Sequence, residues 1–155
     1  MEETLPKDMF LPDADATAAL GLQLAQHLPE RAVVHLHGDL GAGKSTLARA
    51  LLRALGVTGT IRSPTYTLVE QYPLATGGTA LHLDLYRIGD PGELEFLGLD
   101  GDIRLWLVEW PERGQGGLPP ADLDIELAVA GAGRHCRLQP RSKAGIRWLG
   151  TLASG

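Results

Sequence analysis

The segment HGDLGAGKST, residues 37–46, has residue types and a spacing suited to holding phosphate. The pattern G-x-x-x-x-G-K-[ST] is met by Gly38, Gly43, Lys44 and Ser45. Glycines allow backbone N–H groups to turn inward around phosphate oxygens, because no side chain stands in the way. A lysine at this position neutralises the β- and γ-phosphates of a nucleotide, and a serine hydroxyl can bind Mg²⁺. The segment therefore predicts a site for a nucleoside triphosphate and magnesium.

The elements expected on either side of this glycine loop agree with that prediction. The run AVVHLHG, residues 32–38, is short, rich in β-branched residues and ends in glycine, which favours a strand. Residues 43–55 predict a helix that Gly56 terminates. A helix that begins here directs the positive end of its dipole at the loop. A preceding strand and a following helix are the context that the phosphate-binding motif requires.

Two further segments offer the carboxylates that nucleotide hydrolysis needs for the metal ion and the attacking water. In LHLDLYR, residues 81–87, the alternation of a strand places His82, Asp84 and Tyr86 on one face. Glu109 follows the apolar run LWLV, which predicts a strand buried on both faces. Asp84 and Glu109 are therefore candidates for the metal ligand and the base, and their spacing leaves open which residue has which role.

The loop SPTYT, residues 63–67, carries hydroxyl groups at Thr65 and Thr67. Because the loop lies close in sequence to the expected phosphate-binding helix, these hydroxyls could reach a γ-phosphate. Such a loop would become ordered when triphosphate binds and relax after hydrolysis. A plain turn into the next strand is the alternative interpretation.

Two other pairs of residues are explained more simply by structure than by chemistry. His35 and His37 share one face of the strand before the glycine loop, but no further ligands occur at the spacing of a zinc site, so we do not expect zinc. Trp106 and Trp110 are expected in the core and at its rim. Aromatic residues make up only 5% of the chain and its net charge is negative, which does not suit a surface that stacks RNA bases.

Composition restricts the compartment and the class of partner. The 155 residues carry a formal net charge of -5, so direct binding to DNA or tRNA through phosphate contacts is not expected. A single cysteine excludes an internal disulfide. The acidic N-terminus does not resemble a secretion signal, and no apolar run approaches the ~18 residues of a membrane span. We expect a cytoplasmic protein that has no contact with a membrane.

The remaining segments complete the pattern of an α/β protein with one domain, residues 1–155. Helices are expected at residues 12–28, with Asp13 or Asp15 as the N-cap, at 90–99 and at 142–153. A strand is expected after the SPTYT loop, and residues 122–130 and 134–140 predict an antiparallel hairpin. The expected sheet is parallel at its centre, with antiparallel strands added at one edge.

The class of nucleotide-binding protein is partly restricted by one missing residue type. A small GTPase reads guanine through N-K-x-D, and this chain contains no asparagine, which excludes that class. A small-molecule kinase remains an alternative, although the arginines are scattered and no insertion resembles a lid. A binding module in which nucleotide binding, not hydrolysis, is the functional event is the other alternative.

Five blocks of the sequence together resemble the TsaE (YjeE) family. These blocks, in the order and spacing of the family, are GDLGAGKST, SPTYTLVEQY, HLDLYR, ELEFLGL and LVEWPERGQGGLP. The resemblance spans about residues 35–140, most of the chain. The family consists of bacterial P-loop ATPases needed for the threonylcarbamoyladenosine modification of tRNA. The resemblance implies a P-loop NTPase fold with helices on both faces of the sheet.

The resemblance also implies roles for individual residues. ATP would be held by Gly41, Ala42, Gly43, Lys44, Ser45 and Thr46. Mg²⁺ would bind to Ser45 and Glu109, with Asp84 as the further acidic residue and Thr65 in a switch-like loop. The family usually has threonine in place of Ser45, and the hydroxyl group is retained. Arg134 is a candidate for the C-terminal arginine that contacts the base in family members.

Finally, the resemblance implies protein partners. Family members act on a complex of TsaD, which transfers the threonylcarbamoyl group, and TsaB, and ATP hydrolysis resets that complex between turnovers. An acidic ATPase with weak activity of its own suits this role, because tRNA would be reached only indirectly through the partners. We expect the active site to be completed when the partner docks.

Overall fold

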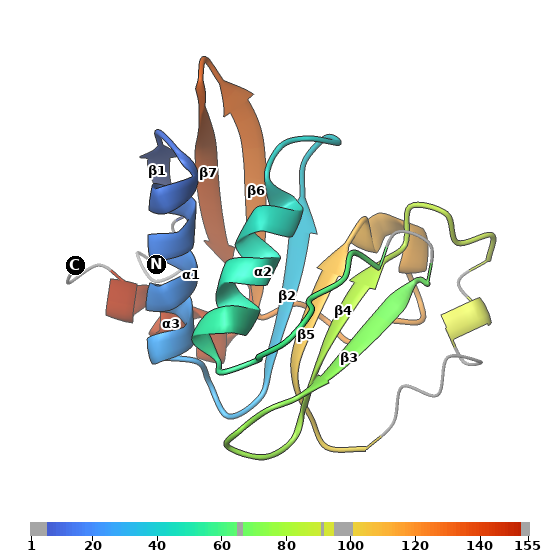
Figure 1. Ribbon diagram of the computed structural model, residues 1–155. Helices are drawn as coiled ribbons and strands as arrows, with labels where there is room; N and C mark the ends of the chain where they lie inside the picture. The colour runs from blue at the N-terminus through green and yellow to red at the C-terminus, as the bar shows by residue number, and fades with distance from the viewer. Residues whose placement is uncertain (1–5, 65–66, 91, 95–100, 153–155) are drawn as a thin grey trace.

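The computed structural model describes residues 6–64, 67–90, 92–94 and 101–152 (Figure 1). Seven strands form one sheet in the order β1-β7-β6-β2-β5-β4-β3. The strands are β1 (Lys7–Leu11), β2 (Ala32–His37), β3 (Val69–Pro73), β4 (Thr79–Asp84), β5 (Ile103–Glu109), β6 (Leu123–Ala130) and β7 (Gly133–Pro140). The helices are α1 (Ala14–Gln26), α2 (Lys44–Ala54), the 3₁₀ helix η3 (Pro111–Gly114) and α3 (Lys143–Leu152).

The centre of the sheet is parallel, as expected: β6, β2, β5 and β4 are successive parallel neighbours. Antiparallel strands lie at both edges, however, and not at one edge only. β3 joins β4 at one edge, because the link of residues 74–78 is too short for the crossover that a parallel neighbour needs. At the other edge β7 pairs with β6, and β1 pairs with β7. β1 was not predicted, since its five residues include the exposed Phe10 and show no marked apolar pattern.

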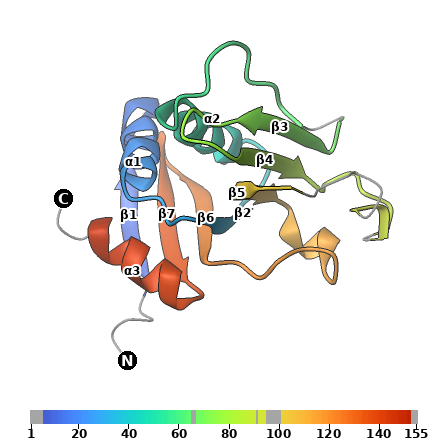
Figure 2. The same cartoon turned by 90° about the horizontal axis from the view of Figure 1, so that it is seen from below.

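The helices α1 and α2 pack against each other on one face of the sheet (Figure 2). α3 lies at the end of α1, where Trp148 Nε1 donates a hydrogen bond to the carbonyl oxygen of Leu24 over 3.1 Å. In the described part of the chain the opposite face carries η3 and a 3₁₀ turn at residues 92–94, so the expectation of helices on both faces is met there by short 3₁₀ segments (Figure 2). The outer half of that face, on β1, β7 and β6, is exposed, as shown by Phe10, His135 and Arg137.

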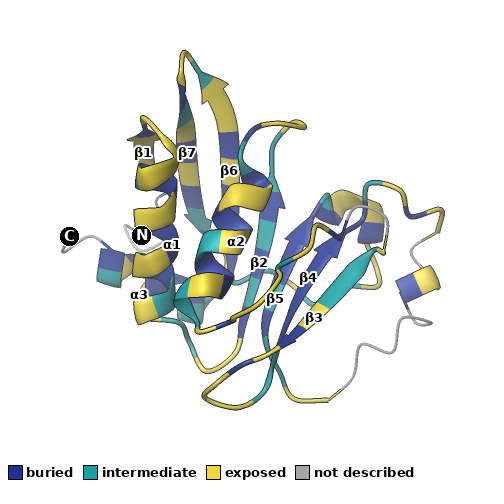
Figure 3. Cartoon of the chain, in the orientation of Figure 1, coloured by how far each residue is buried: buried dark blue, intermediate teal, exposed yellow. Residues whose placement is uncertain are grey.

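The core lies on both sides of the inner strands. Under α1 and α2 it contains residues of all seven strands, such as Val34 of β2 and Leu107 of β5. A second cluster on the other face is formed by Leu81, Leu83 and Val108 together with residues from the segment after β4. β4 and β5 are therefore buried on both faces, as predicted for the run before Glu109 (Figure 3).

Among the described helices, none combines the length and apolar character that crossing a membrane requires.

Most of the predicted elements are confirmed. α1 begins after Asp13, whose side chain accepts a hydrogen bond from the backbone nitrogen of Ala16 over 2.9 Å, so Asp13 and not Asp15 is the N-cap. β4 ends at Asp84, so Tyr86 lies beyond the strand and does not share its face with His82. The helix expected at residues 90–99 falls largely outside the described residues.

Gly21 lies at a tight contact between α1 and α2. A Cβ atom built on Gly21 would lie 2.8 Å from the Cβ of Ala50 and 3.0 Å from the backbone nitrogen of Leu51. Both of those atoms belong to α2 and neither is the end of a flexible side chain. The absence of a side chain at Gly21 therefore allows the contact between the two helices that cover the central strands.

We expect Gly21→Ala to lower the free energy of unfolding by about 1–3 kcal/mol, because the added methyl group overpacks this contact. The matched control is Gly150→Ala in α3, where a Cβ atom would meet nothing within 4 Å. There the same change should raise stability by about 0.5–1 kcal/mol, since alanine is the better helix former. Urea unfolding measures both, and a stabilised Gly21→Ala protein would contradict the packing argument.

Candidate phosphate-binding site

The glycine loop, residues 38–43, connects β2 to α2 at the edge where the parallel strands end (Figure 1). Gly41 and Gly43 have φ angles of 83° and 104°, in the left-handed region that favours glycine. A Cβ atom on Gly38 would collide with the carbonyl oxygen of Leu127, so this position also has no room for a side chain. The first turn of α2 has no side-chain cap and no acidic residue. The positive end of the helix is thus available to an anion.

Lys44 is the first residue of α2, and it is only 4% exposed. Its Nζ atom donates a hydrogen bond to the carbonyl oxygen of Gly38 over 2.6 Å and lies 4.1 Å from the centre of the Trp110 ring. Burial lowers the pKa of Lys44, while the negative charges of Glu109 and Asp84 oppose that shift. The side chain therefore presents a shielded cation beside two carboxylates.

The two predicted carboxylates lie next to each other. β4 and β5 are parallel, and their register pairs Asp84 with Glu109. Both residues are buried, at 6% and 3% exposure. His82 Nε2 lies 2.6 Å from Glu109 Oε2, and Asp84 Oδ1 accepts a hydrogen bond from the backbone nitrogen of Tyr86 over 3.0 Å. Strand pairing thus brings together residues that stand far apart in the sequence.

The oxygen atoms near the loop suit magnesium by their chemistry. Ser45 and Thr46 are exposed in the first turn of α2, and Asp84 and Glu109 add carboxylate oxygens. Hard oxygen ligands are those that Mg²⁺ prefers, and it usually takes one or two carboxylates together with water and phosphate oxygens. Within the described residues, no group of three or more histidine, cysteine and acidic side chains could hold a metal ion by itself.

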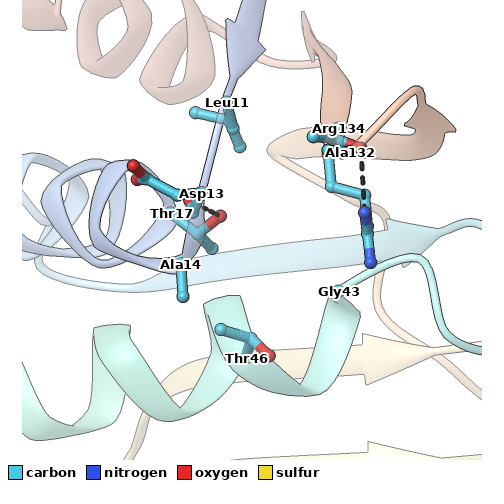
Figure 4. Close-up of a pocket in the computed structure, with 9 residues that line it drawn as sticks. Leu11, Asp13, Ala14, Thr17, Gly43, Thr46, Ala132 and Arg134 are labelled. Atoms are coloured by element: carbon cyan, nitrogen blue, oxygen red, sulfur yellow. Dashed lines mark hydrogen bonds between the residues drawn. The ribbon is translucent and has the colours of Figure 1, made fainter.

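Arg134, on β7, contacts the glycine loop directly. Its Nε atom donates to the carbonyl oxygen of Ala42 over 3.1 Å, and Nη2 donates to that of Gly41 over 3.2 Å. The residue also borders a pocket of about 140 Å³ between the start of α1, the start of α2 and the β6–β7 turn (Figure 4). The lining residues are Leu11, Asp13, Ala14, Thr17, Gly43, Thr46, Ala132, Gly133 and Arg134. The N-terminal segment and the C-terminal arginine therefore meet beside the loop.

The SPTYT loop is only partly described. Thr65 lies outside the described residues, and Thr67 Oγ1 donates a hydrogen bond to Glu70 Oε2 over 2.7 Å. Trp110 was expected at the rim of the core, and the structure places its ring against Lys44. Its position directly after Glu109 is the sequence signal that would have connected it to the site.

With this geometry established, comparison with known proteins identifies the family. The family model for the threonylcarbamoyl adenosine biosynthesis protein TsaE matches residues 11–136. The chain belongs to the TsaE family. The matched range contains the glycine loop, both carboxylates and Arg134, so the family assignment covers the candidate site described above.

Individual relatives agree with the assignment to TsaE. The chain is 40% identical to the tRNA threonylcarbamoyladenosine biosynthesis protein TsaE of Haemophilus influenzae over 144 residues, which cover 88% of this chain and 90% of the relative. It is 39% identical to the protein of the same name from Aquifex aeolicus over 127 residues, or 81% and 89% of the two chains. The crystal structure of Bacillus subtilus YdiB has a similar fold, with a TM-score of 0.79, 24% identity and coverage of 97% and 95%.

Behind the glycine loop, this TsaE-family chain has a small ionic network. His37 Nε2 lies 3.0 Å from Asp124 Oδ1, and Arg141 Nε donates to Asp124 Oδ2 over 2.6 Å. The hydrogen bond to Asp124 raises the pKa of His37, and burial opposes that shift. Burial raises the pKa of Asp124, but the hydrogen bonds from His37 and Arg141 outweigh it, so this pKa is lowered. The raised pKa thus favours the charged form of His37, the residue directly before Gly38.

We expect the pKa of His37 to lie above 6.5, its ordinary value, and Asp124→Asn to lower it. Because the pKa is raised in the folded state, the stabilising contribution of His37 is complete below about pH 6.5. It is lost as the pH rises through the pKa of the folded state. Imidazole NMR titration measures the shift, with His37→Gln to assign the resonance. An unchanged His37 titration in Asp124→Asn would refute this account.

Proposed function

We propose that this chain binds ATP with Mg²⁺ and hydrolyses it in support of the threonylcarbamoyladenosine modification of tRNA. The observation that carries the proposal is the position of Lys44 between a glycine loop and two adjacent buried carboxylates, Asp84 and Glu109, in a TsaE-family chain. The relatives from Haemophilus influenzae and Aquifex aeolicus are named for the biosynthesis of this modified nucleoside.

In this proposal the fold is that of a P-loop NTPase. Backbone N–H groups of residues 41–46 bind the phosphates, and the start of α2 adds its positive dipole. Lys44 moves its ammonium group from the Gly38 carbonyl oxygen to the β- and γ-phosphates. The nucleoside extends toward the pocket beside Arg134, which Gly43 itself lines. The contacts of Arg134 with Gly41 and Ala42 keep the loop in its open, anion-accepting shape.

The contacts of the carboxylates suggest how their roles are divided. His82 Nε2 engages only Oε2 of Glu109, and this leaves the other oxygen for the metal. We therefore assign Mg²⁺ to Ser45 and Glu109, with Asp84 as the further acidic group that orients water. Thr65 is proposed as a γ-phosphate contact. Bound magnesium would supply positive charge where negative charge develops during phosphoryl transfer.

The partners follow from family membership and charge. We propose that the chain acts on TsaD and TsaB in the cytoplasm, and that ATP hydrolysis resets their complex between turnovers. A net charge of -5 does not suit direct binding of tRNA or DNA, so the tRNA would be reached through the partner proteins. Partner docking would complete the site and raise the rate of hydrolysis.

Lys44→Ala should weaken ATP binding at least about tenfold, because the phosphates lose a charge-assisted contact. The matched control is Lys143→Ala, which removes an exposed lysine from the start of α3. Isothermal titration calorimetry measures both affinities. If Lys44→Ala binds ATP as tightly as the control does, the phosphate site is misassigned.

Glu109→Gln should retain the fold and lower partner-stimulated hydrolysis about 100-fold or more, because the amide is a poor metal ligand. Glu30→Gln, a change at an exposed position, is the matched control. Phosphate release and the number of modified tRNAs per TsaD are measured with TsaD and TsaB present. Repeated rounds of modification by Glu109→Gln, or with a non-hydrolysable ATP analogue, would show that hydrolysis is not the functional event.

A further inference from the structure

Lys44 is the inner end of a stack that reaches the protein surface. Its Nζ atom lies 4.1 Å from the centre of the Trp110 ring, and the Trp110 ring centre lies 4.9 Å from that of Tyr86. The guanidinium carbon of Arg113 lies 4.8 Å from the Tyr86 ring centre and 5.8 Å from the Trp110 ring centre. Arg113 Nη1 also donates a hydrogen bond to the carbonyl oxygen of Tyr86 over 2.9 Å. Two aromatic rings are therefore held between two cations.

The backbone at Trp110 explains how its ring reaches Lys44. In a continued strand, the side chains of Glu109 and Trp110 would point to opposite faces of the sheet. Trp110 instead has φ 57° and ψ 51°, a left-handed conformation that is uncommon for a bulky residue. This turn ends β5, begins η3 and directs the indole at the same lysine whose pKa Glu109 influences. Holding a non-glycine residue in this region costs about 1–3 kcal/mol, which the surrounding contacts must offset.

The position of the Trp110 side chain is set by contacts of its ring, and not by a hydrogen bond of its N–H group. Trp110 Nε1 is buried and has no hydrogen-bond partner within the described residues. A buried indole normally finds a partner for its N–H group. The ring itself, in contrast, is engaged by the cations of Lys44 and Arg113, by the tilted ring of Tyr86 and by the apolar cluster on the face opposite α1 and α2. The contact with the lysine is thus the feature of this side chain that distinguishes it from ordinary core packing.

An aromatic face is a suitable partner for this ammonium group. Lys44 has three N–H donors, and the Gly38 carbonyl oxygen accepts from one of them. A carboxylate partner such as Glu109 would form a strong, directional ion pair with this ammonium group. Lys44 would then be less available to phosphate, and Glu109 less available to a metal ion. The indole quadrupole stabilises the charged form without accepting a strong hydrogen bond.

We propose that Trp110 is the positioning residue for Lys44: its ring holds the ammonium group over the glycine loop and away from an ion pair with Glu109. The proposal rests on the proposed function, because it concerns the lysine assigned to the phosphates. The Lys44–Trp110 contact itself exists without nucleotide, so it is also tested without ATP.

The test compares Trp110→Leu, which removes the ring, with Trp110→Phe, which keeps an aromatic face and loses no hydrogen bond. Trp110→Leu should weaken ATP binding roughly 3- to 30-fold, the range expected for a cation–π contact, and Trp110→Phe should restore most of the affinity. Trp106→Leu is the matched control, since Trp106 lies on β5 and packs against the same apolar cluster as Trp110, whereas the Lys44 ammonium group lies over the Trp110 ring. Calorimetry at equal protein stability, checked by thermal unfolding, gives the affinities.

A double-mutant cycle separates positioning from a general structural role. In a Lys44→Met background, Trp110→Leu should cause no further loss of ATP affinity. If Trp110→Leu lowers affinity equally with Lys44 and with Met, or does not lower it at all, the proposal is overturned. If Lys44→Met lowers ATP affinity but Trp110→Leu in the wild-type background does not, only this inference is overturned. If the wild-type chain binds no ATP, the proposed function is overturned.

Tryptophan fluorescence measures the contact between Lys44 and Trp110 in the absence of nucleotide. The emission of Trp110 is obtained as the difference between the wild-type and Trp110→Phe spectra. Lys44→Met should change this difference spectrum, because the indole loses a cation at its face. A difference spectrum that is identical with lysine and with methionine at position 44 would overturn the proposed contact, whatever the outcome with ATP.

Discussion

β5 pairs in parallel with β2 on one side and with β4 on the other, and the candidate site depends on this arrangement. The parallel direction brings the end of β2, where the glycine loop begins, to the same edge as Asp84 and Glu109. Ligand sites of open α/β sheets lie at this edge, because the loops that follow the strands gather there. The antiparallel edge strands add area to the sheet and leave this central geometry unchanged.

The charges at this edge are compatible with burial because each has a partner. Lys44 has the Gly38 carbonyl oxygen and the Trp110 ring, and Glu109 has His82. An unpaired buried charge would cost several kcal/mol, of order 3–5 kcal/mol when one partner of a buried pair is removed. None of these partners is a strong counterion that would neutralise the site completely. The arrangement therefore leaves positive charge in the loop and negative charge beside it, as a magnesium–nucleotide complex requires.

Family membership and geometry support different parts of the interpretation. The TsaE family model and relatives at 39–40% identity fix the family over most of the chain. The YdiB structure, at 24% identity, extends the agreement to the fold. Neither comparison assigns a role to Trp110 or to the Arg134 contacts with the loop. Those rest on contacts within this chain, and they explain how a glycine-rich loop keeps one shape between a helix and two strands.

Local patterns in the sequence were sufficient for the glycine loop, for α1, α2 and α3, and for the central strands. These features depend on residues close together in the chain: the cap at Asp13, the apolar run before Glu109 and the spacing of Gly38, Gly43 and Lys44. Period-two alternation also placed His82 and Asp84 on one face. The family resemblance came from the same local blocks.

Only the tertiary structure decided which distant residues meet. The pairing of β1 with β7, the second antiparallel edge, the contact of Arg134 with Gly41 and the contact of Trp110 with Lys44 join segments far apart in sequence. No periodicity encodes these contacts, because register and strand order depend on the free energy of the whole sheet and its core. At Trp110 a left-handed turn ends β5, and the ring both contacts Lys44 and packs against the cluster of Leu81, Leu83 and Val108. The sequence by itself determined the glycine loop and the elements on either side of it, and the packing of the complete sheet decided what surrounds that loop.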